Sequence, residues 1–137
     1  MTVVVDTSLV LALYDSSDDH HDAAVAWIRD VDDELVTTPL VAAELDHLVG
    51  EASPRARLVL YDDFDRGAFS VRWWADALFE SIDIARRRPD IGLTDASLVA
   101  LAGRFRTEMV ATFDHRHFRT LTTAAGEPFV LLPADAT

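Results

Sequence analysis

Three consecutive valines, Val3 to Val5, followed directly by Asp6, constrain the fold of this chain more than any other feature. A short run of β-branched residues is typical of a strand that is buried on both faces, as in the middle of a parallel sheet. Asp6 would then lie at the carboxyl end of this strand, where α/β sheets bind their ligands. A structural role is equally open, because Asp6 or Ser8 could cap a helix that begins near Leu9.

Beyond this first strand, helix and strand signals alternate along the sequence. We expect further strands over residues 35–37, 68–73, 109–112 and 128–132, and helices that begin near residues 9, 17, 38, 53, 75 and 94. Such alternation predicts an α/β fold with a mainly parallel central sheet of four to five strands. The 137 residues, of which 50% are hydrophobic, fit one domain over residues 1–137 with an ordinary core.

The residue types that are missing exclude several classes of protein. Every one of the 12 basic residues is Arg, and without Lys there can be neither a Walker phosphate loop nor the acceptor pocket of a response-regulator receiver domain. Without Cys there are no disulfides, thiolate metal sites or Cys nucleophiles. The net charge of -12 argues against nucleic-acid binding by the whole surface but permits a local Arg patch. No apolar run approaches a membrane span and no signal peptide is visible, so we expect a cytoplasmic protein.

Glu44 draws attention because of its position in the helix expected after Thr38-Pro39. Leu40, Glu44 and Leu48 would lie one above another, which predicts that Glu44 falls inside the apolar stripe of that helix. An unpaired carboxylate there would be costly, so it needs a metal, a hydrogen-bond donor or a cation. The functional interpretation is a metal site, and the structural alternative is a buried pair with an Arg.

Two more acids occupy comparable positions. Asp95 would lie in the first turn of a helix capped by Thr94, which is also common for reasons of the helix dipole alone. Asp114 follows the strand expected over residues 109–112. A parallel sheet would bring Asp6, Glu44, Asp95 and Asp114 together. Carboxylates in one crevice raise one another's pKa unless a divalent cation compensates, and oxygen ligands suit Mg²⁺ or Mn²⁺.

The basic residues offer weaker signals. His20 and His21 are adjacent on a predicted helix and point in different directions, so we expect a surface or helix-terminal role for them. Arg86, Arg87 and Arg88 form the densest basic run. Cations at the carboxyl end of a helix are ordinary partners of its dipole, and contact with phosphate is the functional alternative.

Four segments together resemble the PIN-domain ribonucleases, and among them the VapC-like toxins of type II toxin-antitoxin modules. The segments are residues 4–8 (VVDTS), 38–45 (TPLVAAEL), 93–97 (LTDAS) and 111–118 (ATFDHRHF). The resemblance implies a Rossmann-like α/β/α sandwich and a metal-dependent endoribonuclease. The catalytic residues that it implies are Asp6, Glu44, Asp95 and Asp114, with Ser8 and Thr112 at polar positions close to the site. Position 117 is often acidic in such proteins and is His here.

From this resemblance we expect one or two Mg²⁺ (or Mn²⁺) ions, held by Asp6, Asp95 and Asp114, to activate a water molecule against the scissile phosphate. Glu44 would hold the metal through water or help to deprotonate the nucleophile. The implied partners are RNA, a cognate antitoxin protein and a second copy of the chain in a homodimer.

Two other classes remain open at this point. One is a metal-dependent phosphatase that works through an aspartyl-phosphate, but such enzymes want a second Asp where this chain has Ser8, and they want the missing Lys. The other is a non-catalytic interaction module with the same fold, in which the acids bind only a metal or a partner.

Overall fold

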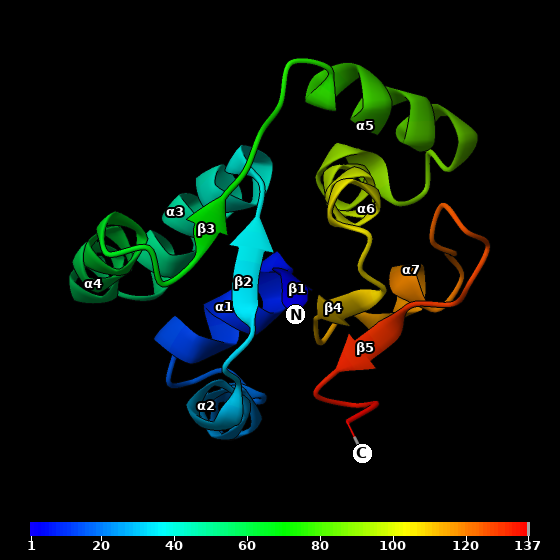
Figure 1. Cartoon of the computed structure of the whole chain (residues 1–137). Coiled ribbons are helices and arrows are strands. Elements are labelled where there is room, and N and C mark those ends of the chain that lie inside the picture. Colours follow the sequence, from blue (N-terminus) through cyan, green and yellow to red (C-terminus); the bar gives the residue numbers. More distant parts are fainter. Residues whose placement is uncertain (137) are drawn as a thin grey trace.

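A computed structural model describes residues 1–136 and confirms the α/β class and the parallel sheet. Five strands form one sheet in the order β3-β2-β1-β4-β5, and every neighbouring pair is parallel (Figure 1). The strands are β1 (Thr2–Val5), β2 (Glu34–Thr37), β3 (Ser70–Val71), β4 (Met109–Ala111) and β5 (Val130–Leu132). The valines of β1 are 0% exposed, as expected for a central strand covered on both faces.

The helices pack in pairs around this sheet. They are α1 (Thr7–Tyr14), α2 (His21–Asp30), α3 (Pro39–Ala52), α4 (Pro54–Asp65), α5 (Ala77–Arg87), α6 (Gly92–Phe105) and α7 (His115–Phe118). Figure 1 shows α3 with α4 on one side and α5 with α6 on the other, joined by the segment that leads from β3 to α5. Within residues 1–136, no helix is long and apolar enough to cross a membrane.

The starts of α3 and α4 agree with the sequence signals. The side chains of Thr38 and Ser53 accept hydrogen bonds from backbone N–H groups of the first turn, and each is followed by Pro at the first helical position. These caps matter for the site because Thr38 fixes where α3 leaves the carboxyl end of β2.

Several boundaries differ from the prediction, among them the following three. The strand expected over 68–73 shrinks to β3, an edge strand that pairs only with β2. The helix expected from Ser17 begins at His21, because the carboxylate of Asp15 accepts from Ser17 and holds the chain in a turn. The helix α6 begins at Gly92, so Thr94 lies inside its first turn and is not its cap.

The topology defines where a ligand would bind. From β1 the chain moves to β2 on one side, whereas β4 lies on the other side of β1, so the strand order reverses between β1 and β4. In open α/β sheets the crevice beyond the carboxyl ends of such strands is the usual binding site. Asp6 follows β1, and Thr112 to Asp114 follow β4. The fold therefore brings these residues to one crevice.

Candidate metal and catalytic site

Asp6 connects the end of β1 to the start of α1 and is only 5% exposed. The backbone N–H of Thr7 donates to its Oδ1 at 2.8 Å, so this carboxylate caps α1. Asp6 therefore caps the helix and also lies at the candidate site. One oxygen serves the helix, and the other faces the residues that follow β4.

Two hydroxyl groups hold that second oxygen. Ser8 Oγ donates to Asp6 Oδ2 at 3.0 Å and Thr112 Oγ1 donates to it at 2.6 Å. Each hydroxyl also accepts a backbone N–H, from Phe113 to Ser8 and from Asp114 to Thr112, both at 2.9 Å. The carboxyl ends of β1 and β4 are thereby tied together, and Asp6 is fixed in one orientation.

The buried position changes the acidity of Asp6. Burial raises its pKa to about 6, the negative charge of Asp95 adds to the rise, and the hydrogen bonds from Thr112, Ser8 and Thr7 oppose it. Near neutral pH the protein therefore keeps a carboxylate in an environment that disfavours its charge. Such a group is stabilised by a nearby cation.

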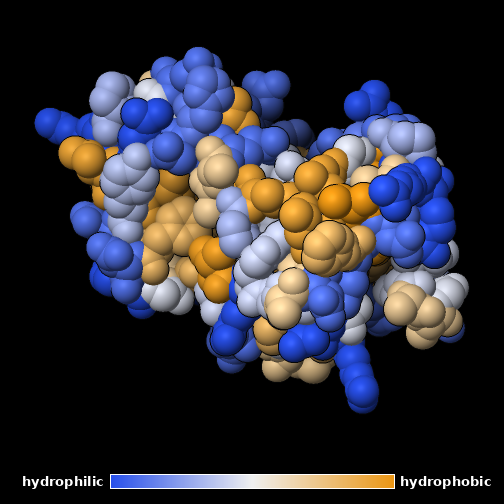
Figure 2. All heavy atoms as spheres, turned by 90° about the horizontal axis from the view of Figure 1, so that it is seen from above, coloured by the Kyte–Doolittle hydropathy of each residue, from blue (hydrophilic) through white to orange (hydrophobic). Residues whose placement is uncertain are grey.

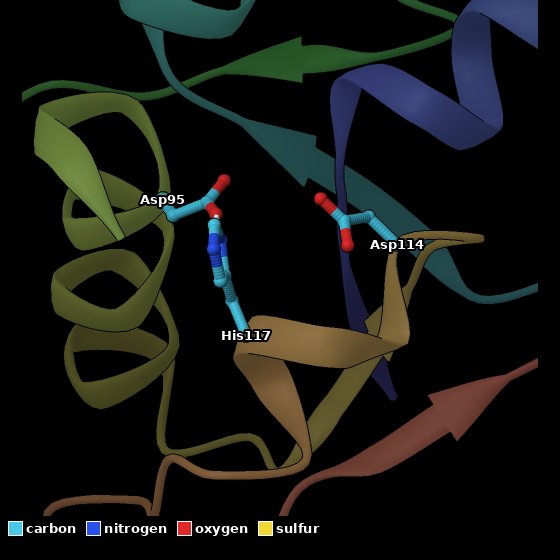
Figure 3. A group of neighbouring side chains, drawn as sticks. All are labelled: Asp95, Asp114 and His117. Atoms are coloured by element: carbon cyan, nitrogen blue, oxygen red, sulfur yellow. Dashed lines mark hydrogen bonds and ion pairs between the residues drawn. The ribbon is translucent and has the colours of Figure 1, made fainter. Parts of the chain in front are cut away.

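Asp95, Asp114 and His117 form the open part of the site (Figure 3). One ligand atom from each of them lies within 4.8 Å of the others. Asp95 lies in the first turn of α6, Asp114 precedes α7, and His117 belongs to α7. Figure 3 shows the two carboxylates facing each other while the His117 ring reaches from α7 to Asp95.

Nδ1 of His117 lies 2.7 Å from Oδ2 of Asp95, and both side chains are about one-fifth exposed (20% and 17%). Burial raises the pKa of Asp95, the hydrogen bond and charge of His117 lower it, and the charges of Asp114 and Glu44 raise it further. This contact was not predicted, although position 117 had been singled out. The spacing of three residues indicates only that His117 lies on the same side of the short helix as Asp114, and it does not predict the distance to Asp95.

Glu44 does not lie inside the apolar stripe of α3, so that prediction was wrong. The buried side of the helix consists of Val41, Leu45 and Val49, and Glu44 is exposed beside it. The start of α3 is apolar on nearly every side, so the sequence did not distinguish one row of residues from the next. Glu44 nevertheless lies close enough to Asp95 for its charge to raise the pKa of that group.

The balance of charge at the site favours a cation. Among residues 1–136, Asp6, Glu44 and Asp114 form no ion pair, which also removes the idea of a buried Glu44–Arg pair. The carboxylate oxygens suit Mg²⁺ or Mn²⁺. The imidazole of His117 adds a nitrogen donor of the kind that transition metals accept more readily than Mg²⁺. The donor set therefore fits a divalent metal ion.

A second feature that was not predicted joins the helices on both sides of the site. Thr38 Oγ1 and Ser97 Oγ lie 2.9 Å apart, and both residues are 0% exposed. Ser97 Oγ also donates to the carbonyl oxygen of Thr94 at 2.6 Å. This buried link connects the start of α3 to the first half of α6, which carries Asp95.

Comparisons with known proteins agree with this geometry. A family model described as PIN domain matches residues 3–122. Ribonuclease VapC26 of Mycobacterium tuberculosis is 34% identical over 135 residues, which cover 96% of this chain and 100% of the relative. Ribonuclease VapC29 of the same species is 30% identical over 137 residues, covering 97% of this chain and 98% of the relative.

The solved structure of M. tuberculosis VapC20, described as a sarcin-ricin loop cleaving toxin, is similar with a TM-score of 0.75. The likeness covers 82% of this chain and 89% of that one at 21% sequence identity. At this identity it supports the fold.

Proposed function

The chain belongs to the PIN-domain family, and from this premise we propose that it is a metal-dependent endoribonuclease that hydrolyses RNA phosphodiester bonds. The relatives that match it along almost its full length are named ribonucleases. We also propose that it works in the cytoplasm as the toxin of a toxin-antitoxin pair.

One observation supports this proposal: ligand atoms of Asp95, Asp114 and His117 lie within 4.8 Å of one another, and buried Asp6 lies near enough for the charge of Asp95 to raise its pKa. Asp6 is buried there and its charge is disfavoured. Three carboxylates gathered without an Arg among them are a poor device for stability, since like charges repel, but they are a good site for a divalent cation.

In the proposed site Asp6, Asp95 and Asp114 would hold Mg²⁺ or Mn²⁺, and His117 would be a further donor. Such an ion, when bound, lowers the pKa of a water ligand and neutralises charge on the scissile phosphate. Ser8 and Thr112 fix Asp6 by hydrogen bonds to its Oδ2. Their role is to position this carboxylate and not to react.

In this scheme Glu44 accepts the proton that the attacking water loses. Its exposed carboxylate on α3 lies within electrostatic reach of Asp95 on α6, so it can accept a proton from the attacking water or hold that water by a hydrogen bond. The water oxygen forms the new bond to phosphorus, the bond from phosphorus to the leaving ribose oxygen breaks, and that oxygen takes up a proton from solvent. No side chain becomes covalently attached.

Cleavage of RNA by the purified chain tests the proposal. We expect cleavage of a mixed RNA substrate with Mg²⁺ or Mn²⁺ and none with EDTA. Asp6→Asn and Asp114→Asn should abolish it, because each removes a charge that holds the ion, while circular dichroism shows an intact fold. Wild-type rates in both variants would contradict the assignment, and an inert wild type would favour the non-catalytic interaction module.

The partners that we propose follow from surface and charge. Large apolar side chains are exposed on α5, with Leu78 at 41% and Phe79 at 69%, and Figure 2 shows apolar atoms gathered over the part of the surface where α5 and α6 lie. We propose that this surface pairs two copies of the chain. Sedimentation should give a dimer that Phe79→Asp dissociates, and an unchanged dimer would point to another face.

An antitoxin would have to neutralise the carboxylates. We propose that it is encoded next to this chain and that one of its arms places an Arg at Asp95 and Asp114, which are partly exposed beside His117. Guanidinium groups bind carboxylates in two-pronged fashion and would compete with the metal. Co-expression with the neighbouring reading frame should yield a complex without nuclease activity, and free nuclease would argue against it.

A further inference from the structure

A cleft of about 790 Å³ lies between α5, α6 and the segment that follows α7. Four of the 12 arginines line it, namely Arg87, Arg88, Arg104 and Arg106, together with one acid, Glu80. We propose that this cleft binds the phosphate backbone of single-stranded RNA next to the scissile bond. The inference rests on the proposed ribonuclease function and adds the path of the substrate.

The local charge of the cleft is opposite to that of the chain. The protein carries 24 acidic residues, yet Arg104 and Arg106 form no ion pair among residues 1–136. Arg87 has two long contacts with Asp83, at 3.6 Å between side chains that are each 70% exposed and at 3.4 Å from Nε to the carbonyl oxygen. Arg104 lies over the Trp74 ring, with 5.3 Å between its guanidinium carbon and the ring centroid, and this stacking leaves its N–H groups free to donate to a ligand. A planar guanidinium suits the geometry of a phosphate group.

The backbone of Arg106 gives an independent reason to look at this cleft. Arg106 ends α6 with φ 53° and ψ 43°, and it is the only residue other than Gly within 1–136 that has a positive φ. Glycine is favoured at this position because a Cβ is strained there. An Arg held in a conformation that suits Gly points to a use for its side chain, since backbone strain is commonly retained at functional sites.

The cleft is connected to the acidic site. Arg88 donates from Nη2 to Thr120 Oγ1 at 2.8 Å, and Thr120 Oγ1 donates to the carbonyl oxygen of His117 at 2.7 Å. His117 contacts Asp95. In addition, α6 carries Asp95 in its first turn and Arg104 in its last, about 14 Å apart along the axis. A strand of a few nucleotides spans this distance.

The structure also divides the basic run of α5. Arg88 is occupied by Asp90 and Thr120 and shapes the wall, Arg87 lines the cleft, and Arg86 does not. Arg86 is exposed and has no ion pair among residues 1–136, so it provides a control of equal charge one residue away. Arg29 on α2 and Arg55 on α4 are likewise exposed and have no ion pair among residues 1–136.

The test compares two triple variants of the whole chain for binding to a fluorescent single-stranded RNA in EDTA over a range of salt concentrations. The cleft variant is Arg87→Gln, Arg104→Gln and Arg106→Gly, and the control is Arg29→Gln, Arg55→Gln and Arg86→Gln. We expect the salt slope of log K to fall by about 2 in the cleft variant, at about 0.7 per lost phosphate contact, and to change little in the control. Arg106→Gly alone should weaken binding without lowering the melting temperature, because the strained conformation is relieved.

If both triple variants lose RNA affinity equally, binding depends only on the net charge of the protein, and the proposal is overturned. A second outcome would also overturn the proposal: an acidic peptide binds only when the cleft arginines are present, whereas RNA binds equally well without them. The cleft would then be a protein-binding surface. The proposed function fails separately: RNA binding that depends on the cleft, without cleavage by the wild type in Mg²⁺ or Mn²⁺, would leave this inference standing and remove the nuclease. In the active enzyme the cleft variant should raise KM and leave kcat unchanged.

Discussion

Asp6 combines two tasks in one carboxylate, since it caps α1 and supplies negative charge at the crevice while being only 5% exposed itself. A pKa raised from 3.8 to about 6 means that the folded protein binds more protons than the unfolded chain between these values. Stability therefore falls as pH rises through this window. The loss is on the order of 3 kcal/mol, at 1.36 kcal/mol per pKa unit.

Replacement of Asp6 by Asn should remove this loss. We expect metal-free Asp6→Asn to equal the wild type in stability at pH 4 and to exceed it at pH 7.5, because the amide carries no charge to desolvate. Urea melts across pH 4 to 8 measure the difference, with Asp62→Asn, an exposed acid, as the control. Below pH 4 the dependence has the opposite sign, because acids such as Asp135, whose pKa Arg119 lowers to about 2, lose their stabilising charge as the pH falls. A wild type that gains stability from pH 4 to 6 would contradict the role given to burial.

Glu44 allows a similarly clear expectation. Because it is exposed and has no ion pair among the described residues, Glu44→Gln should change the free energy of unfolding by less than about 0.5 kcal/mol. Turnover should nevertheless fall, since the amide cannot accept a proton from water. Denaturant melts and cleavage rates of the same preparation test both parts. Full activity would take Glu44 out of the mechanism.

At the scale of secondary structure, the link between Thr38 and Ser97 sets how α3 stands relative to α6. Because Ser97 Oγ donates to Thr94, the Thr38 hydroxyl donates to Ser97. Ser97→Ala leaves this buried donor without an acceptor, and this should cost about 1–3 kcal/mol. Ser81→Ala is the matched control, because Ser81 is equally buried but donates only within α5, to Ala77. A chemical melt in which Ser81→Ala costs as much as Ser97→Ala would show that the link between the helices has no special weight.

The same scale shows what the sequence could and could not predict. The central strand, the acids at Asp6 and Asp114 and the starts of α3 and α4 were predictable, because a valine run and cap-Pro pairs are local signals. The row of α3 that faces the core was not, because Ala42, Ala43 and Leu40 leave the helix apolar on several sides. The contact of His117 with Asp95 depends on how α7 packs against α6, and no local pattern encodes that distance.

At the scale of the whole molecule, the charge of -12 and an arginine-lined cleft coexist because electrostatic recognition is local. The screening length at physiological salt is about 8 Å, so an RNA strand in the cleft responds mainly to the arginines beside it. In the proposed mode of binding, the acids elsewhere repel the phosphates of RNA from the remaining surface. Specificity for a particular RNA therefore belongs to the shape of the crevice and cleft and not to overall attraction.

The hydrogen bond from Thr112 to Asp6 joins residues 106 positions apart, and it has a consequence for synthesis. A growing polypeptide that has left the ribosome only as far as Arg106 contains Asp6, Glu44 and Asp95 but lacks β4, Thr112 and Asp114. We therefore expect such a nascent chain to be unable to cut the RNA of the ribosome that synthesises it. Translation in a cell-free extract from a message that stops after Arg106 should leave ribosomal and messenger RNA intact, whereas the full-length message should not. The order of the chain thus delays toxicity until synthesis is nearly complete.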